Sequence, residues 1–506
     1  MAPDKTCRLK GNVCVAVEQK SRMYSFSITL QQLLTNLMRY IGRVTIDILP
    51  EEVLLDIFDL YVDPTRDCYR VEIWCTLVHV CRKWRNIVLE SPLRLNLRIR
   101  CHPAIPAREK LDIWSDLPVV VAQYGEDWEP EWGVDNVLAA LEQNHRICNI
   151  DLCSVPTWQM EEILEAMHKS FPVLTKLWLL CNDETSPLDP DLFLGGSIPS
   201  LRQLGLCGIP FPEVPKLLLS ATHLTELELD LSPAGYISPE AMTSCLVALT
   251  NLETLILNVD PESLLVREHR PSPPPTRTLL PALTDLEFDG VSEYLEDLVV
   301  RIDTPILDNL KILFFHKFIP DTPQLTQFIN RLPKLKAHNV AHVDFHDDSV
   351  HIKLGRALGK EKGLGISYEV VHQQVLTVAQ VCASSLFQPF GATVECLYIC
   401  DNHPYLRRRI LGRRNHWLEL LRPFTSVKSL YLSLTRRHLA CALHGLVEEG
   451  VARVLPNLKT LFLEKLGLSD PVELFESIIS EQQSSDCPAV AVSHWERRER
   501  DDSWID

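Results

Sequence analysis

ATHLTELELD (residues 221–230), LTNLETLILN (249–258) and LPALTDLEFD (280–289) share one pattern, L-x-x-L-x-L, with apolar residues at the first, fourth and sixth positions. The alternation within each stretch predicts a short strand with one buried face. With Ile, Val or Phe accepted for Leu, the motif begins at Ile147, Leu174, Leu201, Leu224, Leu252, Leu283, Leu310, Leu335, Val394, Val427 and Leu458. Most steps span 23 to 33 residues. Only the step from Leu335 to Val394 is of double length, and VHIKL or GISYEV is expected to hold an irregular strand there.

Return helices are expected between these strands. Ser238-Pro239-Glu240 supplies an N-cap, a first-turn proline and an acid, and Thr322-Pro323-Gln324 opens another helix in a similar way. A strand and a return helix at this period are typical of leucine-rich repeats, whose units bury their apolar faces against their neighbours. The asparagine that many such repeats carry after the third apolar position occurs once, at Asn182, so the repeats are irregular. We therefore predict an α/β fold, in which a short helical N-terminal domain precedes an irregular leucine-rich-repeat solenoid with a curved parallel sheet and outer helices.

The composition is that of a soluble globular protein, with 46% hydrophobic and 23% charged residues. The net charge of -17 argues against nucleic acid as the main partner, because phosphate binding needs a surplus of Lys and Arg. The cysteines have no repeated spacing and are interpreted as reduced thiols. Neither a signal-like apolar segment nor an apolar run of membrane-spanning length occurs, so we expect an intracellular protein, cytoplasmic or nuclear or both, without contact to a membrane.

A different pattern follows Asp47, in the sequence DILPEEVLLDIFDLY. Pro50 suits the first position of a helix, and the acids after it suit the positive end of the helix dipole. A second helical stretch follows, with Val71, Trp74, Val78, Cys81 and Trp84 in helical register. Two short helices with so many large apolar side chains cannot bury them all, and exposed apolar patches usually mark interaction sites. We therefore expect this segment to bind another protein.

The residues of this segment also carry a resemblance. The string Leu49-Pro50-x-Glu52-x-Leu54-x-x-Ile57-Phe58, followed by Val80-Cys81-x-x-Trp84, resembles an F-box. The ending HVCRKWRNIVLESPLRLNLRI resembles the F-box proteins of mushroom-forming fungi, the basidiomycetes. The resemblance implies a substrate-recognition subunit of an SCF-type ubiquitin ligase, which docks on the Skp-type adaptor and, through it, on cullin and RING subunits. It also implies adaptor-facing roles for Leu49, Pro50, Leu54, Ile57, Phe58, Val80 and Trp84.

Four segments are predicted along the chain. Residues 1–45 form an N-terminal extension, partly disordered, with one possible helix from Leu30 to Ile41, and residues 46–95 form the F-box. The repeats occupy residues 96–480, and the polar, charge-dense residues 481–506 form a disordered tail. The alternative function is a leucine-rich-repeat scaffold that acts outside a ubiquitin ligase, and binding of the Skp-type adaptor discriminates between the two.

Enzymatic and metal-binding readings have little support in the sequence. It contains no P-loop, no Gly-x-Ser-x-Gly and no His-Glu-x-x-His, so we expect a non-catalytic protein without a cofactor. One cluster has metal-ligand residue types and is interpreted as polar loop residues: His338, His342, Asp344, His346, Asp347, Asp348 and His351. The basic cluster of Arg407, Arg408, Arg409, Arg413 and Arg414 is interpreted as a solvated surface.

A substrate site is predicted from the repeat pattern. The third, fifth and seventh positions of each motif alternate with the leucines and are expected on the concave face of the sheet. They are acidic in two repeats, at Glu226, Glu228, Asp230, Asp285, Glu287 and Asp289, and the fifth position is aromatic further along, at Phe314, Tyr398, Tyr431 and Phe462. An acidic centre beside an aromatic C-terminal half suits an unknown protein substrate that offers Lys or Arg beside apolar anchors. The alternative is that an acidic protein merely solvates its open face with acids.

Overall fold

The computed structural model describes residues 49–62, 73–92, 94–102, 106–123, 133–181, 185, 192–210, 214–260, 276–315, 322–335, 338–346, 349–355, 363–369, 391–401, 414–434, 436–464 and 490–495. It divides into two compact units, residues 1–99 and residues 100–506. The predicted helix from Leu30 to Ile41 lies outside the described residues. Of the helices that are described, none is both long and apolar enough to cross a membrane.

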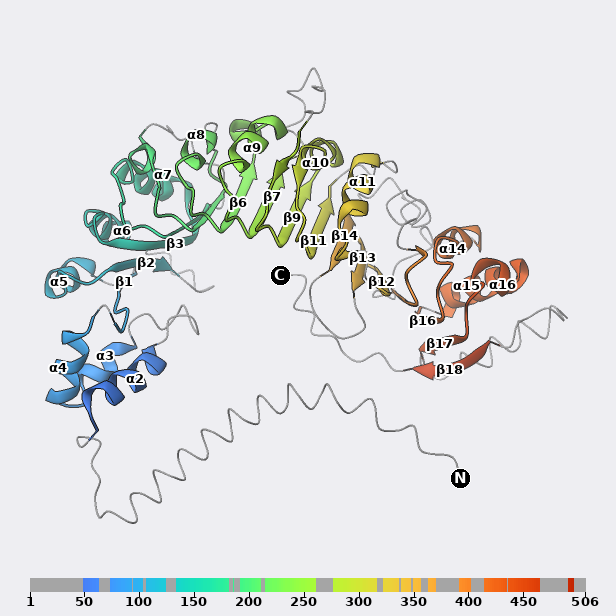
Figure 1. Ribbon diagram of the computed structural model, residues 1–506, viewed down its shortest axis with the longest axis horizontal. Coiled ribbons are helices and arrows are strands. Elements are labelled where there is room, and N and C mark those ends of the chain that lie inside the picture. The colour runs from blue at the N-terminus through green and yellow to red at the C-terminus, as the bar shows by residue number, and fades with distance from the viewer. Residues whose placement is uncertain are drawn as a thin grey trace, which may run out of the picture. The chain divides into compact units, whose positions relative to one another are not determined.

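The first unit contains three helices, α2 (Glu51–Val62), α3 (Trp74–Val78) and α4 (Arg82–Glu90) (Figure 1). The buried apolar residues of these helices are Leu54, Leu55, Phe58, Val62, Trp74, Leu77, Val78, Ile87 and Val88, and Leu95, Leu97 and Ile99 are buried after them. The single helix predicted through Trp84 is in fact two helices. Cys81 has an extended backbone, and its Sγ accepts a hydrogen bond from the Trp84 amide at 3.4 Å. The thiol thus caps a new helix where the apolar spacing alone suggested continuity.

One mostly parallel sheet carries the second unit. Its strands lie in the order β1 (Ile99–Cys101), β2 (Val119–Gln123), β3 (Ile147–Val155), β4 (Lys176–Cys181), β5 (Gln203–Cys207), β6 (Glu226–Leu231), β7 (Thr254–Val259), β9 (Asp285–Gly290), β11 (Asn309–Phe314), β14 (Leu364–Glu369), β13 (Ser349–Gly355), β12 (Val340–Phe345), β15 (Cys396–Asp401), β16 (Ser429–Ser433), β17 (Thr460–Glu464) and β18 (Ala491–Trp495). The short strands β8 (Thr278–Leu279) and β10 (Ile302–Asp303) form a separate pair.

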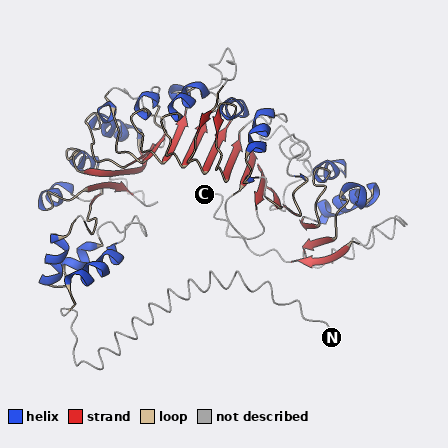
Figure 2. Cartoon of the chain, in the orientation of Figure 1, coloured by secondary structure: helices blue, strands red, loops and turns tan. Residues whose placement is uncertain are grey.

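The helices of this unit lie along one side of the sheet (Figure 2). They are α5 (Ala107–Ile113), α6 (Val134–Leu141), α7 (Thr157–Ala166), α8 (Val214–Leu218), α9 (Pro239–Leu246), α10 (Ser292–Val299), α11 (Pro323–Arg331), α14 (Arg414–Leu421), α15 (Arg436–Glu449) and α16 (Val451–Val454), with 3-10 turns at η3 (Phe193–Gly196) and η4 (Pro233–Gly235). The N-cap at Ser238 is confirmed, since its hydroxyl accepts from the Ala241 amide at 3.2 Å. The opposite side of the sheet, which carries none of the described helices, is called the open face below.

Leucines keep neighbouring strands in register. Leu227 of β6 pairs with Leu255 of β7, which pairs with Leu286 of β9, and all three side chains are buried. Each such side chain contributes about 2 kcal/mol on burial. Every second residue therefore points to the helices, and the residues between them line the open face. The predicted α/β class is confirmed at the level of a large, mostly parallel sheet that follows an N-terminal helical unit.

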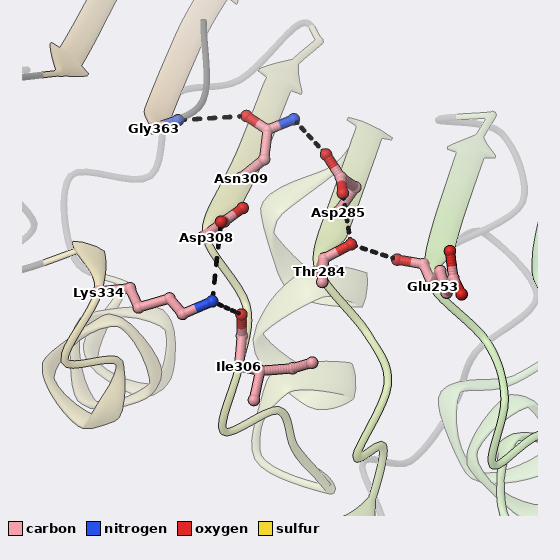
Figure 3. A network of polar contacts seen from close by, with 8 residues as sticks. All are labelled: Glu253, Thr284, Asp285, Ile306, Asp308, Asn309, Lys334 and Gly363. Carbon is pink, nitrogen blue, oxygen red and sulfur yellow. Dashed lines mark hydrogen bonds and ion pairs between the residues drawn. The ribbon is translucent and has the colours of Figure 1, made fainter. Parts of the chain in front are cut away.

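The double-length step holds both suggested strands, β13 in VHIKL and β14 in GISYEV. β13 is antiparallel to both of its neighbours, so that β14 lies parallel beside β11 and β12 lies parallel beside β15. A polar network joins β14, the last of the three strands in this step, to β11 and β9 (Figure 3). Asn309 donates through Nδ2 to Asp285 Oδ1 at 3.1 Å and accepts on Oδ1 from the Gly363 amide at 3.4 Å. Asn309 thereby joins β9, β11 and the residue before β14.

The predicted disordered tail is wrong for residues 491–495. These residues form β18, which pairs parallel with β17 from Ala491 to Trp495. The charge density of the tail suggested disorder, but the short string AVSHW lies between the charged residues and pairs with the backbone of β17.

Candidate protein-interaction sites

An apolar patch lies on the outside of the first unit. Val53, Ile57, Leu60 and Tyr61 are exposed, and their spacing places them on one face of α2. Leu60 is the most open, with 69% of its surface accessible. These four residues are called the α2 patch. The Tyr61 hydroxyl lies 3.3 Å from Thr76 Oγ1, which brings the end of the α2 patch to α3, and Val80, just after α3, is also exposed.

The residues predicted to face the adaptor fall into three groups, which are buried, exposed or half-buried. Leu54 and Phe58 are fully buried, so the prediction is wrong for these two, whose side chains form the core of the unit. Pro50, Ile57 and Val80 are exposed and available to a partner.

Leu49 and Trp84 are half-buried. The Leu49 carbonyl accepts from Lys83 Nζ at 3.1 Å, and the Trp84 ring lies 4.8 Å from the Phe58 ring. Val53, Leu60 and Tyr61 were not predicted to face the adaptor, although their helical spacing from Ile57 places them on the same side of α2.

Residues 46–99 match the family model of the F-box-like domain. The match ends where the first compact unit ends, and it includes the α2 patch and Val80. F-box-like domains in general serve as adaptors in ubiquitin ligases and bind Skp-type adaptor proteins. No curated protein matches the chain.

The open face of the second unit carries acids on β6 and β9. Glu226, Glu228 and Asp230 are half-buried and alternate along β6 with buried leucines. Each carboxylate has a partner on a neighbouring strand. Glu226 accepts from Gln203 Nε2 at 2.7 Å, Glu228 accepts from Cys207 Sγ at 3.4 Å, and Asp230 accepts from Asn258 Nδ2 at 2.7 Å.

Burial changes the acidity of this cluster. It raises the pKa of the Glu228 carboxyl, with a further increase from the charges of Asp230, Glu226 and Glu287, while the Cys207 thiol opposes the shift. Burial also raises the pKa of Asp230, against hydrogen bonds from Asn258 and the Gly208 amide. The pKa of the Cys207 thiol is raised by burial and by the two acids beside it, so this thiol stays protonated at neutral pH.

Acids of the second acidic strand, β9, also have polar or charged partners. Asp285 accepts from the Thr284 hydroxyl at 2.6 Å and from Asn309. Glu287 forms an ion pair with Lys311 Nζ at 3.2 Å, and both side chains are exposed. Asp289, at the seventh position of the motif, is half-buried on the same face. Lys311 therefore places a positive charge beside the acids that were predicted to form the centre of this face.

The assignment of Phe314 to this face is wrong. Phe314 is buried on the helix side and lies in register with Gly290, whereas Lys311 and Leu313 are the neighbours of Glu287 and Asp289. The motif fits as well from Leu307 as from Leu310, and a shift of three residues moves every side chain to the other face. The motif placed at Leu335 is displaced by three residues as well. Ala341 and Val343 of β12 pair with Leu397 and Ile399 of β15, so the buried His338 stands where the first leucine of the motif would be.

Aromatic rings line the C-terminal part of the open face. Tyr398 stacks on Tyr431 with ring centroids 4.2 Å apart and planes at 10°, and Tyr431 stacks on Phe462 at 4.3 Å and 4°. His342 of β12 continues the row on Tyr398 at 4.4 Å and 18°. These four residues are called the aromatic ladder. His342 was not predicted to belong to this row, because the motif placed at Leu335 leaves it outside the fifth position.

The remaining clusters show no site among the described residues. His351 lies between the Ser349 and Ser367 hydroxyls, at 2.9 and 2.7 Å, and its ring meets His346 edge to face. In the part of the chain that the structure describes, no group of three His, Cys, Asp or Glu residues has the geometry to hold a metal. Arg407, Arg408, Arg409 and Arg413 of the basic cluster lie outside the described residues, as do Asp347 and Asp348.

Proposed function

We propose that this protein is a substrate-recognition subunit of an SCF-type ubiquitin ligase. Its F-box-like domain docks on a Skp-type adaptor, which connects it to cullin and RING subunits, and its second unit binds a protein substrate. The observation that carries the proposal is the α2 patch, an exposed apolar surface within the segment that matches the F-box-like family. The chain acts by binding and transfers no ubiquitin itself.

The second unit is proposed to be an irregular leucine-rich-repeat domain. The support is the recurrence of L-x-x-L-x-L together with parallel strands that keep their leucines in register, as in β6, β7 and β9. The resemblance of residues 79–99 to the F-box proteins of mushroom-forming fungi supports a fungal, intracellular setting.

The open face is the proposed substrate surface. Its acids favour Lys or Arg in the substrate by electrostatic complementarity, and its aromatic ladder favours apolar groups. Within the ladder the rings cover one another's faces, so what they offer a partner is mainly their edges. We therefore assign Lys and Arg contacts to the acidic strands and apolar contacts to the ladder.

Co-purification with a Skp-type adaptor tests the function. Changing both Ile57 and Leu60 to Asp is expected to abolish the complex, because apolar anchors at an interface cost about 2 kcal/mol or more each when lost. Ile113→Asp is the matched control, since Ile113 is 71% exposed but lies on α5 in the other unit. Circular dichroism checks that both variants fold. Undiminished adaptor binding by the folded double variant would contradict the proposed docking surface, and absence of binding by the unmodified chain would favour the scaffold function.

A further inference from the structure

The aromatic ladder already has an occupant from the chain itself. Trp495, in β18, lies with its ring centroid 5.4 Å from that of Tyr431, at 78°, and 6.0 Å from that of Tyr398, at 68°. Its indole Nε1 donates to the Leu432 carbonyl at 3.3 Å. A ring placed across the edges of two others is a favourable aromatic arrangement, because ring faces are negative and ring edges positive.

Among the described residues of β18, the side chains are little buried, and besides Trp495 only Val492 packs against the apolar core. Ala491, Ser493 and His494 are exposed, and Val492 and Trp495 are only half-buried. In the neighbouring strand β17, by contrast, Leu461 and Leu463 are fully buried. Segments with few buried apolar contacts open at a small free-energy cost. We expect β18 to detach far more readily than β17.

Detachment of β18 would expose two complementary features. The backbone N–H and C=O groups of β17 that now pair with β18 would lose their partners over Thr460 to Glu464. The edges of Tyr398 and Tyr431 would lose the indole. An extended peptide satisfies such a site by adding a strand, in which the main-chain hydrogen bonds supply affinity and a side-chain contact supplies specificity.

We propose that β18 is a displaceable internal occupant, and that the partner of this surface is an extended peptide segment that pairs parallel with β17 and sets an aromatic side chain on the ladder. The structure of Trp495 defines the preferred group, a flat ring with a donor that reaches the Leu432 carbonyl. Only the description of this partner as a ubiquitination substrate rests on the proposed function. The peptide site itself does not require the adaptor.

The test uses the full chain and a fluorescent peptide of residues 488–498, PAVAVSHWERR. In the unmodified chain the internal strand competes with the peptide, which weakens the apparent affinity by the fraction of open sites. Trp495→Ala in the chain is expected to strengthen peptide binding by about tenfold or more, because the open state becomes populated. Trp158→Ala is the matched control, since Trp158 is 63% exposed on α7 and should leave peptide affinity unchanged.

Two further variants locate the binding contact. A peptide with Ala in place of Trp495 should lose about tenfold in affinity for the Trp495→Ala chain, and Tyr431→Ala in that chain should cause a similar loss. Tyr431→Leu in the same background keeps an apolar residue at this position and checks that any loss does not reflect unfolding, as thermal melting will also show. Equal peptide affinity of the unmodified and Trp495→Ala chains would overturn the proposal, as would full affinity of the Ala-substituted peptide.

This result is separable from the adaptor experiment. Peptide binding without adaptor binding would retain the peptide site and reject the ligase function. Adaptor binding without the tenfold gain in peptide affinity would retain the ligase function and reject the peptide site.

Discussion

Strands β6 and β9 carry carboxylates at the position where β15, β16 and β17 carry aromatic rings. Neighbouring strands pair in the same way in both regions, but the side chains at this position are stabilised by different contacts. Glu228 and Glu287 each depend on a different group from an adjacent strand, Cys207 or Lys311. Tyr398, Tyr431 and Phe462 stabilise one another by stacking. The acidic region should therefore respond to pH and salt, whereas the aromatic region should respond to the loss of ring area.

The largest effect is expected from Tyr431→Ala, which removes the ring stacked on both sides. We expect a loss of about 2 to 3 kcal/mol in the free energy of unfolding, from lost burial and lost ring contacts. Urea denaturation measures it. Tyr431→Phe retains the ring and should change stability by less than about 0.5 kcal/mol. A cost for Ala no larger than the cost for Phe would show that the rings do not stabilise one another.

At the fifth motif position, β4 carries Trp178 and β5 carries Gly205, so that a large ring packs beside a residue without a side chain. Gly205→Ala tests this packing. A Cβ at Gly205 would lie 2.6 Å from the Trp178 ring, so the ring must shift. We expect a loss of about 1 to 2 kcal/mol in stability, measured by denaturation and by the near-ultraviolet signal of tryptophan. Gly355→Ala is the control, since its Cβ would meet nothing within 4 Å. Equal effects of the two substitutions would refute the close packing of Trp178 on β5.

Glu228→Gln tests whether the stability of the acidic region depends on pH. A carboxyl whose pKa is raised by folding stabilises the fold below its unfolded pKa, about 4.3, and this contribution is lost as pH rises through the folded pKa. Ionised Glu228 therefore costs stability at pH 7, and the Gln variant should be more stable there. The gain should stay below about 1 kcal/mol, because the side chain is partly solvated and screened. It should vanish near pH 4, as denaturation at both pH values will show.

The same comparison has an internal control in the aromatic region. Tyr431→Phe should show the same stability difference at pH 4 and at pH 7, since no carboxyl is altered. A gain for Glu228→Gln that persists unchanged at pH 4 would contradict the assigned role of ionisation.

The smallest effect is expected from Lys311→Met, which removes the cation beside Glu287. The pair is exposed on both sides, 46% for Lys311 and 37% for Glu287, and such pairs contribute about 0 to 1 kcal/mol. We expect a change below about 0.5 kcal/mol at physiological salt, detectable by a thermal melt at low ionic strength. A loss above 1 kcal/mol would mean that the acids of β9 depend on this single charge.

The sequence predicted which residues of most strands share a face, because leucine spacing reports burial directly. It did not determine which residue begins the motif in β11, because Leu307 and Leu310 both fit. This ambiguity placed Phe314 on the open face, although its side chain is buried. In α2 the apolar residues were evident, but which side of the helix faces the core depends on tertiary packing. Leu54 and Phe58 turned out buried, with Leu60 and Tyr61 outside. Trp495 stood in a charge-rich tail, and only the pairing of β18 with β17 brings it to the ladder.

The reversed order of β14, β13 and β12 has a consequence for how the chain acquires its fold during synthesis. β12 leaves the ribosome before β14 and runs in the same direction as β11, so it meets β11 in the way that each earlier strand meets its predecessor. The native neighbour of β11, however, is β14, which is synthesised later. We therefore expect a β11–β12 pairing to compete during folding and to open before β14 pairs with β11. The hydrogen bond from the Gly363 amide to Asn309 Oδ1 then stabilises β14 in its native place.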